Sequence, residues 1–336
     1  MKALTTEEMR GLERRAAGNG WPEDRLLAEA GKRLARSLAE FFRRPGTVVG
    51  YLGKGHNAGD ALVAMDTLAR EHGWRVILRP GFPPEACAPL TRAVWSESDL
   101  PAPVDELPDW RRLPRPLVAL DGLLGIGAAG APRAPLAALV AEMAWLRQHA
   151  GAVVAAVDLP SGVDPDSGTI HEGAVTADVT FMIGAPKTGL LSAAAADAVG
   201  ALVVVPVAPL APPAAGPLAL IAPESLTPVH VPRPFDFHKG MAGRVAVLAG
   251  SANYPGAAAL AACGALHGGA GLVYLAAPVG NAAAVATRCP PEIIVRQVAN
   301  PLEVLETQPD ALVIGPGLVP PSTDWNDSFI RLIETS

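Results

Sequence analysis

The sequence predicts a two-domain α/β protein with parallel sheets, on three observations. Short β-branched runs alternate with longer helical patterns, which is typical of β-α-β units. The chain has 336 residues, of which 50% are hydrophobic, so it is long enough to bury two cores of ordinary size. The proline- and alanine-rich stretch PVAPLAPPAAGP at 206–217 favours an extended connection. We therefore expect domains at residues 1–217 and 218–336.

The first domain is predicted to open with a helix, because Thr5-x-x-Glu8 is a capping-box pattern. A further helix is predicted from about Asp60 to His72, after a glycine-rich turn. Short apolar runs predict six strands, at Thr47–Leu52, Arg75–Leu78, Leu117–Leu120, Ala152–Val157, Val179–Ile183 and Leu202–Val207.

The second domain shows the same alternation of strand and helix patterns. A helix of small residues is predicted at Ala257–Leu266. The predicted strands are Arg244–Leu248, Leu272–Leu275 and Ala311–Ile314. The glycines around these strands, Gly250, Gly256, Gly269, Gly271, Gly315 and Gly317, indicate a second pocket at strand ends.

Charge and cysteine usage exclude several classes of partner. The chain carries 27 basic and 33 acidic residues, a formal net charge of −6, and no basic stripe that could follow a nucleic acid. Its 3 scattered cysteines are too few for a disulfide framework or a zinc site. The most apolar stretches are interrupted before about 20 residues, and no apolar signal segment follows the charged start. We therefore expect a cytoplasmic protein that binds neither nucleic acid nor membrane.

The first motif is the glycine-rich turn GKGHNAGD at 53–60, between a strand and a helix. Such a turn lets backbone N–H groups approach a phosphate, and Gly53, Gly55 and Ala58 fit the dinucleotide fingerprint G-x-G-x-x-G/A. Asp60 argues against an ordinary dehydrogenase, because its carboxylate would repel a pyrophosphate. Arg79, after the next strand, could still favour a 2′-phosphate. The alternative is a tight turn in which Asp60 caps the helix.

Two further strand ends carry acidic residues. Asp121 opens the loop DGLLGIGAAGAPR, and Asp158 opens the loop DLPSGVD. The carboxyl ends of parallel strands face the crevice where such sheets bind ligands. Partial burial would raise the pKa of Asp158 and suit it to proton transfer. With Asn57, Asp60 and Ser161, the two aspartates form a set of oxygen ligands that hard cations prefer. The alternative roles are a helix N-cap with a flexible loop for Asp121 and a turn-forming residue for Asp158.

In this order the motifs resemble the bifunctional NAD(P)H-hydrate repair enzymes. The most specific blocks are VAAVDLPSGVDPDSG at 154–168, FMIGAPKTGLL at 181–191 and HKGMAGRVAVLAGS at 238–251. The resemblance implies an N-terminal epimerase of NAD(P)H hydrate, NAD(P)HX, on a Rossmann-like three-layer sandwich with a parallel-rich sheet. It also implies a C-terminal ADP- or ATP-dependent dehydratase on a ribokinase-like α/β fold.

The resemblance further implies the functional residues. Asp158 would be the catalytic residue and would also contact NAD(P)HX. Asn57, Asp121 and Ser161 would bind a potassium ion. In the second domain, substrate contacts are implied at Ala258 and Gly317. In the first domain they are implied at His56, Asn57, Ala58, Gly59, Asp60, Gly125, Ile126, Gly127, Ala128, Ala129, Gly130 and Ala131.

Two departures from the family pattern bear on function. His56, Ala58 and Ala61 replace the Asn, Gly and Gly of the usual loop, which favours an alternative: a catalytically weak module that binds NAD(P)-like ligands or a protein. Nothing after Gly317 matches the Gly-Asp segment that holds the nucleotide in the family's dehydratase. We therefore expect an incomplete second domain without dehydratase activity, which would use ADP or ATP only if the missing part were supplied. A homo-oligomer is compatible with the sequence, which leaves the oligomeric state open.

Overall fold

The structure is a computed structural model that describes residues 1–212, 216–221, 225, 232–320 and 322–335. The chain divides into two compact units, Met1–Pro228 and Val229–Ser336. The first unit continues past residue 217 because the next segment pairs with the N-terminus. Ala3 N donates to Leu218 O at 3.0 Å, and Leu220 N donates to Met1 O at 2.9 Å. Part of the predicted connection, residues 213–215, lies outside the described residues.

The first unit is built on a six-stranded parallel sheet in the order β2-β1-β3-β4-β5-β6. All the predicted strands are present, as β1 Thr47–Leu52, β2 Arg75–Pro80, β3 Leu117–Gly122, β4 Val153–Val157, β5 Val179–Ile183 and β6 Ala201–Val205. The chain passes from β1 to β2 on one side and then to β3 on the other side of β1. Ligands of parallel sheets bind at the carboxyl ends beside such a reversal.

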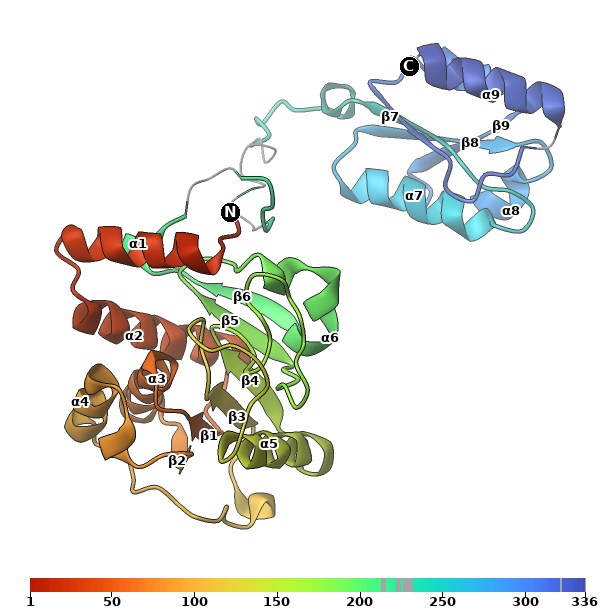
Figure 1. Cartoon of the computed structure of the whole chain (residues 1–336). Coiled ribbons are helices and arrows are strands. Elements are labelled where there is room, and N and C mark those ends of the chain that lie inside the picture. Colours follow the sequence, from red (N-terminus) through yellow and green to blue (C-terminus); the bar gives the residue numbers. More distant parts are fainter. Residues whose placement is uncertain (213–215, 222–224, 226–231, 321, 336) are drawn as a thin grey trace. The chain divides into compact units, whose positions relative to one another are not determined.

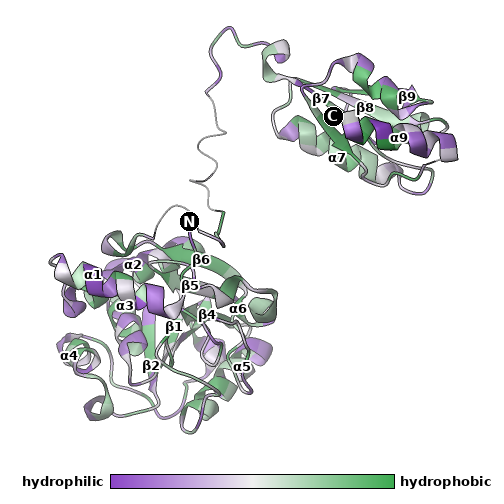
Figure 2. Ribbon diagram, turned by 45° about the horizontal axis from the view of Figure 1, so that its top comes forward, coloured by the Kyte–Doolittle hydropathy of each residue, from purple (hydrophilic) through white to green (hydrophobic). Residues whose placement is uncertain are grey.

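Helices cover both faces of this sheet, which gives the predicted three layers (Figure 1). They are α1 Thr6–Gly18, α2 Glu23–Phe42, α3 His56–His72, α4 Pro89–Glu97, α5 Leu136–Ala150 and α6 Ala196–Val199. One hydrophobic core packs α1, α2 and α3 against the sheet and includes Leu34 and Met65. A second hydrophobic core packs α5 against the sheet and includes Met143. Figure 2 shows the hydrophobic strands between helices that carry the hydrophilic residues.

Helix α1 begins as predicted, whereas α3 begins earlier than predicted. Glu8 N donates to Thr5 Oγ1 at 3.2 Å and Thr5 N donates to Glu8 Oε2 at 3.0 Å, so the capping box is confirmed. The N-cap of α3 is Gly55, so Asp60 lies inside the helix and its interpretation as a cap is wrong. Packing of the first turn against α2 and α4 offsets the low helix propensity of glycine at position 59.

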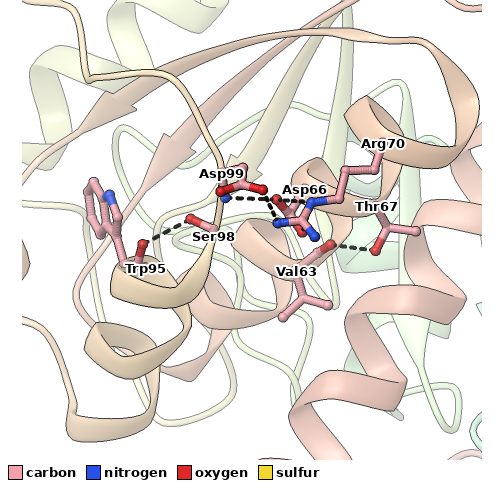
Figure 3. Close-up of polar contacts among 7 residues, drawn as sticks. All are labelled: Val63, Asp66, Thr67, Arg70, Trp95, Ser98 and Asp99. Atoms are coloured by element: carbon pink, nitrogen blue, oxygen red, sulfur yellow. Dashed lines mark hydrogen bonds and ion pairs between the residues drawn. The ribbon is translucent and has the colours of Figure 1, made fainter.

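Helix α3, which carries much of the site described below, is fixed on two sides. A methyl group on Gly31 of α2 would lie 2.4 Å from Val63 Cβ, so the two helices approach through a residue without a side chain. Arg70 forms ion pairs with Asp66 and Asp99, with N–O distances of 3.0 and 2.7 Å, which tie α3 to the segment after α4 (Figure 3). Because exposed pairs contribute about 0–1 kcal/mol each, the close helix packing is the stronger constraint.

The second unit contains a four-stranded parallel sheet in the order β10-β7-β8-β9. Its elements are β7 Arg244–Leu248, α7 Pro255–His267, β8 Leu272–Pro278, α8 Ala282–Ala286, β9 Ile293–Val298, β10 Ala311–Ile314 and α9 Thr323–Thr335. The three predicted strands are confirmed. Strand β9 was not predicted, because this edge strand buries only its first and last residues and lacks a clear alternation. Among the described residues, no helix is both long and apolar enough to cross a membrane.

Candidate active site

A cavity of about 550 Å³ lies at the carboxyl ends of the strands, beside the reversal between β1 and β3. Its wall includes the loops after β1, β3 and β4 and one face of α1. Eight of the predicted contact residues line it: His56, Asn57, Asp60, Gly125, Ile126, Gly127, Ala128 and Asp158. The structure therefore brings residues from three separate motifs into one site.

The other predicted contacts of the first unit do not line this cavity. Ala58 is fully buried in the core, and a methyl group on Gly59 would lie 2.8 Å from Leu27 Cδ1. Both residues therefore face the helix packing, because α3 has already begun at His56. Ala131 is exposed. A small neighbouring cavity is lined by Ala129 and Gly130.

The three predicted cation ligands are joined by hydrogen bonds at the loop after β3. Ser161 donates its hydroxyl to Asp121 Oδ1 at 2.6 Å and its N–H to Asp121 Oδ2 at 2.7 Å. Leu124 N donates to Ser161 Oγ at 2.9 Å. Asn57 Nδ2 donates to Leu124 O at 2.8 Å. One chain of hydrogen bonds thus connects the loops after β1, β3 and β4.

Asp121 is a fully buried carboxyl group without a basic partner. Burial raises its pKa to about 6, although hydrogen bonds from Ser161 and Leu123 act in the opposite direction. In the part of the chain that the structure describes, no Lys or Arg bonds to Asp121. Because Asn57 Nδ2 is committed to a carbonyl, its Oδ1 remains to accept a ligand. Amide, hydroxyl and carboxylate oxygens fit a hard cation such as K⁺, whose charge would offset that of Asp121.

We expect K⁺ to stabilise the protein at pH 7.5 more than at pH 5. A carboxyl whose pKa is raised from 3.8 to about 6 on folding lowers stability as the pH rises through that range, because the folded protein must release a proton that it holds more tightly. A cation reverses this effect only where Asp121 is ionised. At ten times its dissociation constant, K⁺ would add about 1.4 kcal/mol and raise Tm by about 3–6 °C.

The measurement is thermal unfolding in KCl and in choline chloride at equal ionic strength. Asp121→Asn is expected to abolish the difference between pH 7.5 and pH 5. Equal Tm values in the two salts at pH 7.5 would count against a potassium site.

Asp158 lies directly after β4 in a backbone conformation that is rare for residues other than glycine. Its φ is +68°, a strained value of the kind that clusters at functional sites. Its N–H donates to Phe181 O at 2.8 Å, and its Oδ1 accepts from Ile183 N at 2.8 Å and from Lys187 Nζ. The side chain remains 13% exposed. The structure thus fixes this carboxylate at the cavity wall.

Lys187 is a site residue that the sequence reasoning missed. Its side chain is 1% exposed, and Nζ also donates to Ile183 O at 2.8 Å. It lies within the segment 181–191, which carried the family resemblance, but only the fold brings it back to the end of β4. Lys187 is therefore a buried partner of Asp158 and does not itself line the cavity.

Helix α1 adds Arg10 and Glu13 to the cavity wall, and neither was predicted. Burial, followed by the negative charge of Asp158, raises the pKa of Glu13. Burial, followed by the charges of Asp158 and Glu13, raises the pKa of Asp60 well above its ordinary value. Three carboxyl groups therefore share one cavity, and burial together with their mutual repulsion raises the pKa of Asp60 and of Glu13.

Arg79 is not free to bind a 2′-phosphate, so that interpretation is wrong. Its Nε and Nη2 bond Oε1 and Oε2 of Glu142 at 2.9 and 2.5 Å, and its Nη1 donates to Val104 O at 2.8 Å and to Asp105 O. Tyr51 OH donates to the same Glu142 at 2.9 Å. Arg79 therefore has a structural role at the end of β2, which removes support from the dehydrogenase alternative.

In the second unit, the segments of Ala258 and Gly317 meet at the ends of β7 and β10. Gly250 N donates to Pro316 O at 2.9 Å. A methyl group on Gly317, whose φ is +64°, would lie 2.7 Å from Ala257 Cβ. Ala258 is fully buried in the core, so its side chain packs inside this unit. The two strand-end loops thus adjoin each other, and their role in substrate binding stays a prediction.

Comparison with known proteins identifies both parts of the chain. Residues 23–189 match the family described as YjeF-related protein N-terminus, and residues 245–335 match the family NAD(P)H-hydrate dehydratase. Two curated relatives share the name bifunctional NAD(P)H-hydrate repair enzyme. The one from Hyperthermus butylicus is 34% identical over 94% of this chain and 60% of its own length. The one from Coxiella burnetii is 32% identical over 98% of this chain and 67% of its own length.

Two solved structures were also found. The yeast protein ynu0 aligns with a TM-score of 0.46 and 18% identity, over 56% of this chain and 83% of its own. A ribokinase-like superfamily protein from Enterococcus faecalis aligns with a TM-score of 0.28 and 29% identity, over 31% of this chain and 37% of its own length.

The chain spans only part of its curated relatives: 60% of the length of the Hyperthermus protein and 67% of the length of the Coxiella protein. Because the chain is 32% identical to the Coxiella relative over 67% of that protein's length, it belongs to the family of bifunctional NAD(P)H-hydrate repair enzymes.

Proposed function

We propose that this chain interconverts the R and S forms of NAD(P)HX in the cavity of the first unit. The observation that carries the proposal is Asp158, whose carboxylate is held at the cavity wall by Ile183 N and Lys187. The name of the curated relatives supports the choice of substrate. The match of residues 23–189 to an N-terminal family model supports the choice of unit.

The chemistry needs a proton carrier at C6 of the hydrated nicotinamide ring. C6 bears a hydroxyl group beside N1. A proton delivered to this hydroxyl lets the N1 lone pair expel it as water, so the C6–O bond breaks. Water then adds to C6 from the other face and returns a proton to the enzyme. We assign this proton transfer to Asp158, and general acid–base catalysis of this kind contributes about 10²- to 10⁴-fold.

Other groups at the site are suited to binding. The N-terminal turn of α3, with His56 and Asn57, presents backbone N–H groups and the positive end of the helix dipole. Lys54 and Arg10 line the same cavity and offer charges for a pyrophosphate. A potassium ion held by Asn57, Asp121 and Ser161 would supply a positive charge beside the loops that these residues join.

The proposal is tested with NADPHX that an independent S-specific dehydratase has depleted of the S form. Added to the remaining R form in potassium buffer, this chain is expected to restore consumption by the dehydratase. An R form that persists at the uncatalysed rate would refute epimerase activity. If NADPHX binding were still detectable in that case, the alternative of a weak binding module would replace it. Against that alternative, Ala58 and Ala61 are fully buried in the core and do not line the cavity.

For the second unit, we propose that this 336-residue chain does not dehydrate NAD(P)HX. Residues 318–336 contain no Gly-Asp pair of the kind that the resemblance requires at the nucleotide site. Incubation of S-NADPHX with the chain and ATP or ADP is therefore expected to release no NADPH above the blank. Nucleotide-dependent release of NADPH would overturn this prediction.

A further inference from the structure

Epimerisation at C6 requires proton transfer on both faces of the nicotinamide ring. The hydroxyl leaves from one face, and the incoming water loses a proton on the other face. Asp158 is fixed by its backbone, Ile183 N and Lys187, so its carboxylate is held on one side of the cavity. A ring bound in one orientation therefore needs a second proton carrier.

Asp60 is placed to fill this role. It lies on α3, whereas Asp158 lies after β4, so the two carboxyl groups reach the same cavity from different elements. Asp60 also lines an adjoining hollow of about 340 Å³ between α1 and α2. In the described part of the chain no group hydrogen-bonds to the Asp60 carboxyl, in contrast to the two bonds on Asp158. The backbone at Asp60 packs closely against α2, since a methyl group added to Gly31 would lie only 2.9 Å from Asp60 O.

The two aspartates have different charged neighbours. Asp60 interacts with Glu13 and Asp158, which are acidic, and with Lys187, which is basic and bonded to Asp158. Arg10, Lys54 and His56 also line the cavity, and Arg14 and Glu23 line the adjoining hollow. Asp158 thus has an ammonium partner, whereas burial and the two neighbouring carboxyl groups raise the pKa of Asp60.

We propose that Asp60 is a second catalytic residue, which serves the face of the ring opposite Asp158. This inference rests on the proposed epimerase function. In one direction Asp60 gives its proton to the C6 hydroxyl, the C6–O bond breaks, and water departs. A water molecule on the other face then forms a new C6–O bond and gives a proton to the Asp158 carboxylate. The reverse direction uses the protonated Asp158 as the acid and the Asp60 carboxylate as the base, so atoms and charges balance.

The test is incorporation of ¹⁸O from labelled water into the C6 hydroxyl of each epimer of NADPHX. The wild type is expected to label both epimers and to interconvert them. In Asp60→Asn, interconversion should fall by about 100-fold or more, because one face lacks a proton carrier. One epimer should still exchange its hydroxyl with retention of configuration, through Asp158. Asp158→Asn should show the same behaviour for the other epimer. Asp197→Asn, at an exposed position of α6 that does not line the cavity, is the control.

The outcomes separate the two proposals. A wild type that does not interconvert the epimers refutes the epimerase function itself. A wild type that is active, with Asp60→Asn equally active, refutes the role of Asp60. Parallel loss of exchange and interconversion for both epimers in a folded Asp60→Asn also refutes it, because Asp60 would then only position the substrate. Thermal unfolding of each variant shows that the protein tested is folded.

Discussion

Asp158→Asn is expected to lower the rate of R-to-S interconversion by about 10²- to 10⁴-fold. The amide has nearly the same shape as the carboxylate, and its oxygen can still accept from Ile183 N and from Lys187. The strained backbone at φ +68° is also tolerated by Asn. What the variant loses is the ability to accept and release a proton. The rate is measured with the R form and an excess of S-specific dehydratase.

Asp197→Asn provides the control for this experiment. Asp197 is an exposed residue of α6, and it does not line the cavity. The control is expected to keep the wild-type rate. An Asp158→Asn enzyme within about threefold of the wild type would show that the proton moves through another group, and the assignment of Asp158 would be withdrawn.

Lys187→Met is expected to lower the free energy of unfolding by about 3–5 kcal/mol, which is typical of a buried ion pair that loses one partner. The ammonium group is enclosed, with 1% of the side chain exposed, and it bonds Asp158 and Ile183 O. Met fills a similar volume but leaves the Asp158 carboxylate without its counter-charge. Urea unfolding, with equal m values for variant and wild type, gives the difference.

The double variant Lys187→Met, Asp158→Asn is expected to recover part of the lost stability, because no unpaired charge remains. A double-mutant cycle then isolates the interaction between the two side chains. Additive effects of the two substitutions would show that the pair is not coupled in the folded protein, contrary to the contact between Nζ and Oδ1.

The sequence was sufficient to predict the residues at strand ends and insufficient for those that reach the site through tertiary packing. Asp121 lies at the carboxyl end of β3, and Asp158 and Ser161 follow its parallel neighbour β4, so their proximity follows from strand recognition alone. Lys187 and Glu13 carry no such signal. The loop after β5 must turn back before Lys187 reaches Asp158, and Glu13 lies on the amphipathic helix α1.

Two local errors have a common physical cause. The sequence predicts that α3 starts at about Asp60, because Ala58 and Gly59 lie in a glycine-rich stretch that is typical of a turn. Packing against α2 instead makes these two residues helical. Strand β9 was missed because it pairs only with β8 and keeps its middle residues partly or fully exposed. In both places a neighbouring element decides the conformation, and that neighbour is distant in sequence.

The pairing of residue 4 connects the Asp158 carboxylate to the N-terminal segment through Lys187. Leu4 N donates to Pro186 O at 2.8 Å and Thr188 N donates to Leu4 O at 3.0 Å, so Leu4 holds the backbone on both sides of Lys187. Deletion of residues 1–4 would remove both hydrogen bonds while sparing every residue of the cavity wall. It is therefore expected to loosen the segment that holds the Lys187 ammonium group against Asp158.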